Sequence, residues 1–143
     1  MKAIRQALIL LLISAMLGGV TRLIMQPVPR MEGVQRDENT LTLEAAEQLT
    51  APVRWIDARG KSAYDENHIP NALLLNEDAW EQLLPNLLAV YSPDSVLIVY
   101  CDSSHCDASR QVAKRLRDEV GLKNVYTLEG GWQAWKARAD AKR

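Results

Sequence analysis

The chain has 143 residues, a formal net charge of −1 and two cysteines. A nearly balanced charge gives no electrostatic basis for binding nucleic acid, so we expect no nucleic-acid partner. The part that follows an apolar N-terminal stretch has roughly a hundred residues, which is the size of one domain with a single core.

Residues 1–25 differ in composition from the rest. Lys2 and Arg5 precede an almost unbroken run of apolar and small residues from Ala7 to Val20, and further apolar residues extend it to Met25. This pattern is typical of a secretory signal peptide or of an uncleaved signal anchor, that is, an N-terminal hydrophobic helix. We favour the anchor, because no clean cleavage site follows the run, and the basic start favours a cytoplasmic N-terminus. The sequence therefore predicts a domain anchored to the inner membrane and located in the periplasm, or secreted there if the segment is cleaved.

Residues 26–39 have the composition of a linker, with two prolines, a glycine and charges without periodicity. Beyond them, apolar runs typical of strands alternate with segments of helical periodicity. We expect strands over 53–57, 73–75, 96–100 and 125–128. We expect helices over 43–49, over 78–88 with Pro85 kinking or splitting it, over 108–120, and after Gly131. A turn or short helix should begin at 60–64. This alternation predicts one α/β domain over 40–143, with a central parallel sheet flanked by helices on both faces.

The run Val96–Tyr100 is continuously apolar or aromatic, which indicates a buried strand, and Cys101 follows it directly. In open α/β sheets ligands bind at the carboxyl ends of the strands. Free backbone N–H groups in a loop and at a helix start stabilise an anion there. We therefore expect a thiol of lowered pKa that acts as the nucleophile. The anion-binding loop would consist of Asp102, Ser103, Ser104, His105, Cys106 and Asp107.

A second cysteine lies five positions after the first. A disulfide between Cys101 and Cys106 is sterically conceivable, but it would close a small loop and contribute little stability. In an oxidising compartment we interpret such a bridge as a redox state of a working thiol. Cys106 could resolve an oxidised or persulfidated Cys101, could be the reactive thiol itself, or could simply pack.

Other polar residues near the predicted sheet edge have weaker claims. Arg59 is more typical of a structural pair with Asp57, although it could face the pocket and hold a substrate. His68 and His105 could ligate zinc together with the two cysteines. Their spacing contains neither CxxC nor HxxxH, so we predict no metal site, and nothing in the sequence calls for a cofactor.

Three separate stretches resemble the signatures of rhodanese-like domains. They are Asp57-Ala58-Arg59 with His68-Ile69-Pro70-Asn71-Ala72, then Val99-Tyr100-Cys101, then Asn124 to Trp132 with its Gly-Gly-Trp ending. The resemblance implies one α/β domain whose cysteine accepts a sulfane sulfur from a donor such as thiosulfate. The resulting persulfide passes to a thiophile such as cyanide or a protein thiol.

The loop after Cys101 departs from the family pattern. It is longer by about three positions, and Asp102 and Asp107 add negative charge that opposes thiosulfate and raises the pKa of a thiol. The predicted function is therefore an extracytoplasmic sulfurtransferase that carries a persulfide on Cys101 and passes it to a thiol. Its partners would be a small anionic sulfur donor or a protein persulfide or thiol.

Three alternatives stay open. The first is a thiol–disulfide redox protein that uses Cys101 and Cys106, and the second is a non-catalytic binding module. The third, a phosphatase of the related longer-loop type, ranks last, because Asp107 stands near the position where an arginine would hold the phosphate.

Overall fold

The computed structural model of the protein describes residues 39–103 and 106–142. The predicted signal segment and nearly all of the linker therefore lie outside the described residues, and so do Ser104 and His105. Within the described ranges no helix combines the length and apolar character needed to cross a membrane. These ranges belong to one compact unit, Arg36–Arg143.

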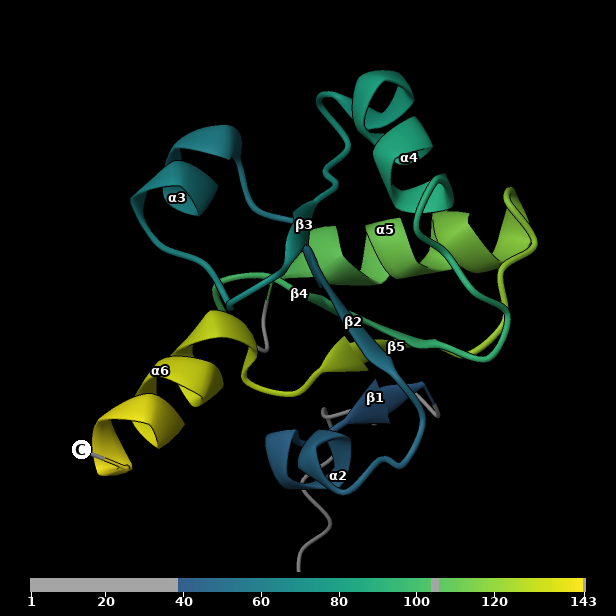
Figure 1. Ribbon diagram of the computed structural model, residues 1–143. Coiled ribbons are helices and arrows are strands. Elements are labelled where there is room, and N and C mark those ends of the chain that lie inside the picture. Colours follow the sequence, from purple (N-terminus) through teal and green to yellow (C-terminus); the bar gives the residue numbers. More distant parts are fainter. Residues whose placement is uncertain (1–38, 104–105, 143) are drawn as a thin grey trace, which may run out of the picture. The chain divides into compact units, whose positions relative to one another are not determined.

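A single sheet forms the centre of this unit, with strand order β1-β5-β4-β2-β3 (Figure 1). All of its pairings are parallel, as predicted. Strand β4 lies between β5 and β2, and each of its residues is buried. The strands are β1 (Thr40–Leu41), β2 (Val53–Asp57), β3 (Leu73–Leu74), β4 (Val96–Tyr100) and β5 (Val125–Leu128).

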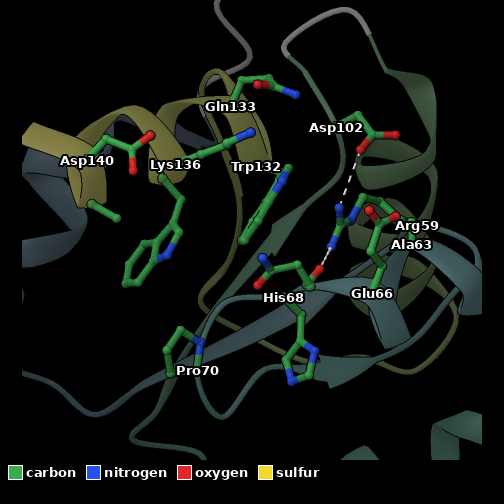
Figure 2. Close-up of a pocket in the computed structure, with 13 residues that line it drawn as sticks. Arg59, Ala63, Glu66, His68, Pro70, Asp102, Trp132, Gln133, Lys136 and Asp140 are labelled. Atoms are coloured by element: carbon green, nitrogen blue, oxygen red, sulfur yellow. Dashed lines mark hydrogen bonds and ion pairs between the residues drawn. The ribbon is translucent and has the colours of Figure 1, made fainter.

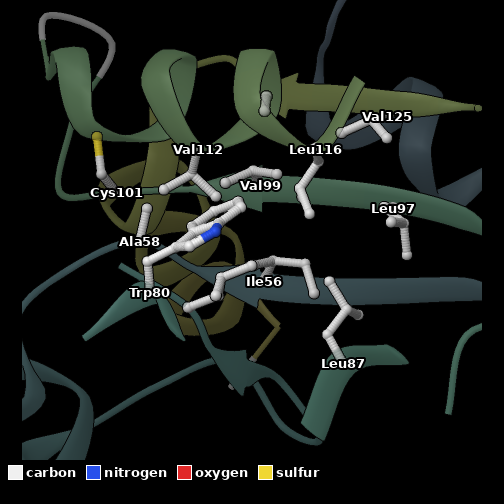
Figure 3. Close-up of a cluster of buried hydrophobic side chains, with 12 residues drawn as sticks. Ile56, Ala58, Trp80, Leu87, Leu97, Val99, Cys101, Val112, Leu116 and Val125 are labelled. Carbon is white, nitrogen blue, oxygen red and sulfur yellow. The ribbon is translucent and has the colours of Figure 1, made fainter. Parts of the chain in front are cut away.

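Helices cover both faces of the sheet, which confirms the predicted architecture. They are α2 (Leu43–Glu47), α3 (Lys61–Glu66), α4 (Trp80–Leu88), α5 (Asp107–Asp118) and α6 (Gly131–Ala141). On one face Leu97, Val99 and Cys101 pack in a core with residues of α4 and α5, as Figure 3 shows. On the other face Ile98 and Tyr100 share a core with residues of α2 and α6. Successive side chains of a strand alternate between faces, so Cys101 faces α5 and its neighbour Tyr100 faces away.

Two details differ from the sequence prediction. Helix α4 runs from Trp80 to Leu88 without being split at Pro85. The φ of proline suits a helix. The N–H that proline lacks would have donated to the carbonyl of Glu81, an exposed residue near the helix start, so only this one carbonyl loses its helical hydrogen bond. Strand β1 was not predicted, because two residues are too short for a periodicity. It is fixed by its partner instead, with Thr40 Oγ1 lying 2.9 Å from Thr127 Oγ1 of β5.

The start of α6 is attached to the backbone that follows β4. The N–H of Trp132 donates to the carbonyl of Cys101 at 2.7 Å, and the N–H of Gln133 donates to the carbonyl of Asp102 at 3.3 Å. Residue 131 permits this approach only because it has no Cβ, since a Cβ there would overlap the carbonyl oxygen of Cys101. Gly131 also has a φ of +54°, a backbone conformation that residues other than glycine rarely adopt. This glycine therefore sets how closely α6 approaches the cysteine.

A buried polar network joins the ends of β2 and β4. The Asp57 carboxylate is fully buried and binds the Arg59 guanidinium through Nε and NH2, with a shortest distance of 2.7 Å. The hydroxyl of Tyr100 donates to Asp57 Oδ2 at 2.7 Å and accepts from the N–H of Ile69 at 3.1 Å. A second bond from Arg59 NH2 reaches the carbonyl of Asn67 at 2.6 Å. The network attaches the loop after β2 and the loop after α3 to the carboxyl end of the sheet, where Cys101 lies.

Burial, and next the hydrogen bond to the Asp57 carboxylate and its charge, raise the pKa of Tyr100 well above its ordinary value. The N–H of Ile69 and the charge of Arg59 act in the opposite direction and only partly offset this.

Gly131→Ala should lower the free energy of unfolding by about 2–4 kcal/mol, because it combines a left-handed φ with a steric overlap. Urea unfolding measured by circular dichroism checks this. Gly60→Ala is the matched control, since a Cβ at Gly60 meets nothing within 4 Å. It should cost less than about 1 kcal/mol, and equal losses in the two variants would contradict the argument.

Tyr100→Phe should lower the free energy of unfolding by about 1–3 kcal/mol at neutral pH, because the buried N–H of Ile69 loses its acceptor and Asp57 loses a donor. The pKa of Tyr100 is higher in the folded protein than its unfolded value of about 10. The contribution of this hydroxyl is therefore complete below about pH 10 and is lost as the pH rises toward the folded pKa.

Urea unfolding at a series of pH values from 8 upward tests the second point. Wild type should lose stability above about pH 10 more steeply than Tyr100→Phe. Gly60→Ala, which removes no titratable group, is the control and should keep the wild-type slope. Parallel curves for wild type and Tyr100→Phe would show that this hydroxyl does not titrate with unfolding.

Candidate active site

Cys101 stands at the carboxyl end of the central strand, where its side chain faces α5 at the edge of the core (Figure 3). Only 1% of the residue is exposed. Its backbone is fixed through the carbonyl that accepts from Trp132, and Tyr100 before it is held by Asp57. The position of the thiol is thus determined by two elements remote in sequence, α6 and β2.

The structure joins Cys101 and Cys106 in a disulfide, with their Cα atoms 6.3 Å apart. Cys106 is the N-cap residue of α5, and its N–H donates to the carbonyl of Ser103 at 3.2 Å. The disulfide that the sequence analysis left open is therefore present here. It joins the residue that directly follows β4 to the N-cap residue of α5.

The remaining described members of the predicted anion-binding loop lie around this bridge. The Asp102 side chain is 65% exposed, and its Oδ1 lies 3.5 Å from Arg59 NH1. Ser103 is partly buried. Asp107 begins α5, is exposed and forms an ion pair with Arg110 one turn later. Negative charge is therefore present at the loop, as the sequence predicted, and one of its two carboxylates already has a cationic partner on its own helix.

Three oxygen atoms surround the sulfur of Cys101. The carbonyl oxygens of Ser103 and Cys106 lie 3.4 Å and 3.6 Å from Sγ, and the hydroxyl of Ser109 lies at 3.5 Å. A hydroxyl donates a hydrogen bond to a thiolate, whereas carbonyl oxygens only accept. The contacts of this sulfur with the described residues are therefore contacts with oxygen atoms, and the predicted cradle of amides stays a prediction for the reduced loop.

Ser109 was not singled out in the sequence. It is buried on the first turn of α5, three positions after Cys106. Residues three apart on a helix share a face, so its spacing from Cys106 was the available signal.

A cavity of about 350 Å³ opens beside the bridge. Cys106 lines it together with Asp102, whereas Cys101 is not among its described lining residues. The carboxylates of Glu77 and Asp78 also line it, and Glu77 is paired with Arg115 at 3.0 Å. Of the two cysteines, Cys106 is the one that lines this cavity.

A larger cavity of about 610 Å³ lies on the other side of Arg59, against α6 (Figure 2). Its described lining residues include His68, Trp132 and Lys136 but neither cysteine. Size alone would favour this cavity as the active site, but of the two cavities only the smaller one is lined by a cysteine. Arg59, Ala63 and Asp102 line both cavities and so lie between them.

Arg59 has the structural role that the sequence favoured and also faces both cavities. Its guanidinium carbon lies 4.9 Å from the ring centre of Trp132, a cation–π distance. Burial acts to lower the pKa of Arg59, but the hydrogen bonds and charge of Asp57 outweigh it and raise the pKa overall. Arg59 is therefore a permanent cation, with most of its charge engaged by Asp57.

Of the two histidines that the sequence analysis considered as metal ligands, His68 lies in the described part of the chain, where it contacts Tyr64. His68 stacks on Tyr64 with ring centres 4.0 Å apart, and its Nδ1 lies 2.8 Å from the carbonyl of Tyr64. His105 lies outside the described residues. In the described part of the chain no three His, Cys, Asp or Glu side chains are grouped to hold a metal ion.

Comparison with known proteins places these features in a family. The family model described as "Rhodanese-like domain" matches residues 42–138. The "Thiosulfate sulfurtransferase GlpE" of Coxiella burnetii is 35% identical over 81 residues, which cover 57% of this chain and 69% of that protein.

Solved structures agree on the fold. The rhodanese-like domain protein from Staphylococcus aureus gives a TM-score of 0.52 at 23% identity, covering 68% of this chain and 90% of the other. The BH2092 protein from Bacillus halodurans gives 0.51 at 25% identity, and the likeness spans 61% of this chain and only 60% of that one. The match over most of the domain, with Cys101 at the end of the central parallel strand, shows that this chain belongs to the rhodanese-like domain family.

Proposed function

We propose that the domain is a sulfurtransferase in which Cys101, once reduced, accepts a sulfane sulfur and carries it as a persulfide to a thiol acceptor. The observation that supports this most is the position of Cys101 at the carboxyl end of β4, in a chain of this family. In the first step the thiolate attacks the outer sulfur of the donor. With thiosulfate, the bond to the sulfonate sulfur breaks and sulfite leaves.

The disulfide form does not perform this step. Both sulfurs are bonded to each other, and Cys101 is 1% exposed. Reduction by a thiol must therefore come first, and it frees a thiolate beside the hydroxyl of Ser109, which lies 3.5 Å from the sulfur. A hydrogen bond to the charged form favours the thiolate.

The charges around the small cavity bear on the donor. Asp102, Glu77 and Asp78 line it, and Arg59 is largely neutralised by Asp57. Such a site disfavours a dianion more than a persulfide of low charge. The Coxiella protein is named for thiosulfate; for this chain we propose a persulfide of low charge as the better donor.

The second candidate is a thiol–disulfide redox protein. The Cys101–Cys106 bridge supports it, as does the position of Cys106 at the cavity wall. The two candidates differ in whether sulfur is added to Cys101 before the bridge forms.

The proposed location of the domain is the periplasmic side of the inner membrane, on the sequence of residues 1–25 alone. The full-length protein should then stay in the membrane fraction after alkaline carbonate extraction, and its domain should be cleaved by protease added to spheroplasts. A protein found in the soluble fraction and protected from protease would contradict both parts.

The reduced Cys106→Ser variant treated with a persulfide of low charge or with thiosulfate should gain one sulfur atom on Cys101, detected by mass spectrometry of the alkylated peptide. Cys101→Ser should take up no sulfur, and the persulfide should give a higher yield than thiosulfate. Protein that is not reduced, and so keeps its disulfide, should gain no sulfur from the same donors. The sulfurtransferase proposal fails if the reduced protein, and the reduced Cys106→Ser variant, take up no sulfur from either donor.

A further inference from the structure

We propose that Cys106 is the internal acceptor for the Cys101 persulfide, so that the domain releases free sulfide and ends each turnover as the disulfide. This inference rests on the proposed function, because it begins with the persulfide on Cys101. It changes the product: sulfane sulfur would leave as sulfide, and a separate thiol would serve as reductant instead of sulfur acceptor.

The backbone holds the two cysteines in place for this step. Cys101 is fixed by the bond from the N–H of Trp132 to its carbonyl, and Cys106 is fixed as the N-cap of α5. Their Cα atoms are 6.3 Å apart and their sulfurs are bonded. The sulfur of Cys106 therefore reaches the inner sulfur of a Cys101 persulfide without displacement of the sheet or the helix. A neighbouring thiol held in this way has a large advantage over an external thiol in solution.

The reaction balances without a further oxidant. The sulfur of Cys106 attacks Sγ of the Cys101 persulfide, a sulfur–sulfur bond forms between the two cysteines, and the bond from Sγ to the terminal sulfur breaks. The terminal sulfur takes the Cys106 proton and leaves as hydrosulfide. The sulfane sulfur gains two electrons, and the two cysteines lose them as they form the disulfide.

The same geometry indicates how the cycle restarts. Cys106 lines the small cavity, whereas Cys101 is buried and does not appear among the described lining residues. A thiolate reductant in this cavity therefore attacks Cys106 and forms a mixed disulfide there. The leaving group is the Cys101 thiolate, which lies beside the Ser109 hydroxyl. A second thiol then releases Cys106. Three acidic residues line the cavity. They favour a reductant whose remaining groups are neutral or cationic over one whose remaining groups are anionic.

The test is a single turnover under anaerobic conditions. Wild type, Cys106→Ser and Cys101→Ser, all full-length, are reduced, freed of reductant and mixed with sodium tetrasulfide. Intact mass reports the protein species, peptide mapping reports which cysteine is modified, and trapping with monobromobimane reports sulfide. Cys106→Ala serves as a second variant, and circular dichroism confirms that each variant is folded.

Wild type should become the disulfide, with the loss of two hydrogen atoms and no retained sulfur. It should release one equivalent of sulfide more than Cys106→Ser, and many equivalents when dithiothreitol is present. Both Cys106 variants should stop at the persulfide on Cys101, and Cys101→Ser should neither take up sulfur nor release sulfide.

The other outcomes overturn the inference in distinguishable ways. A wild type that accumulates the Cys101 persulfide, as the Cys106 variants do, without a bridge and without extra sulfide, refutes the internal acceptor and leaves the sulfurtransferase standing. A persulfide found on Cys106 in wild type replaces sulfide release by a relay between the two thiols. Cys106 variants that take up no sulfur remove the sulfurtransferase and this inference together.

Discussion

The hydrogen bond from the N–H of Trp132 to the carbonyl of Cys101, made across Gly131, is the constraint on which the site depends. It joins the start of α6 to the end of the central strand at 2.7 Å. The bond fixes the peptide that follows Cys101 and so fixes where the loop to α5 begins. Because the glycine has no Cβ, the helix reaches a distance that any other residue would prevent. The Gly-Gly-Trp stretch thus positions the cysteine without touching its sulfur.

Alternation along β4 divides two kinds of chemistry between the faces of the sheet. Tyr100 turns to one face and closes a fully bonded network with Asp57, in which the charge of Arg59 is compensated. Cys101 turns to the other face, among apolar side chains and beside the hydroxyl of Ser109. The charged network can therefore rigidify the sheet edge, while the environment of the sulfur is decided mainly by the loop and the first turn of α5.

The sequence was sufficient for elements whose pattern is local. The strands β2, β4 and β5 have the predicted bounds. The pattern is clearest in β4, a continuous run of buried apolar and aromatic residues, which is typical of a central strand in a parallel sheet. Strand β1 escaped prediction, since its two residues are defined by β5. The cysteine was equally visible, as the first residue after such a run. What remained hidden was pairwise geometry: the contact of Ser109 with the sulfur, the position of Arg59 and Asp102 between the two cavities, and the bond between the cysteines.

The length of the loop decides which chemistry follows the first sulfur transfer. A short loop after the nucleophile leaves a persulfide facing an open pocket, where only an external acceptor can remove the sulfur. In this chain the loop extends to Cys106 at the helix start, and in the proposed reaction the acceptor would be covalently part of the protein. Intramolecular attack does not depend on the concentration of a partner, so an external thiol must compete with a neighbour that is always present. The rate of the cycle would then depend on how fast the disulfide is reopened. The acidic residues that line the cavity together with Cys106 would act on that step by selecting the charge of the reductant.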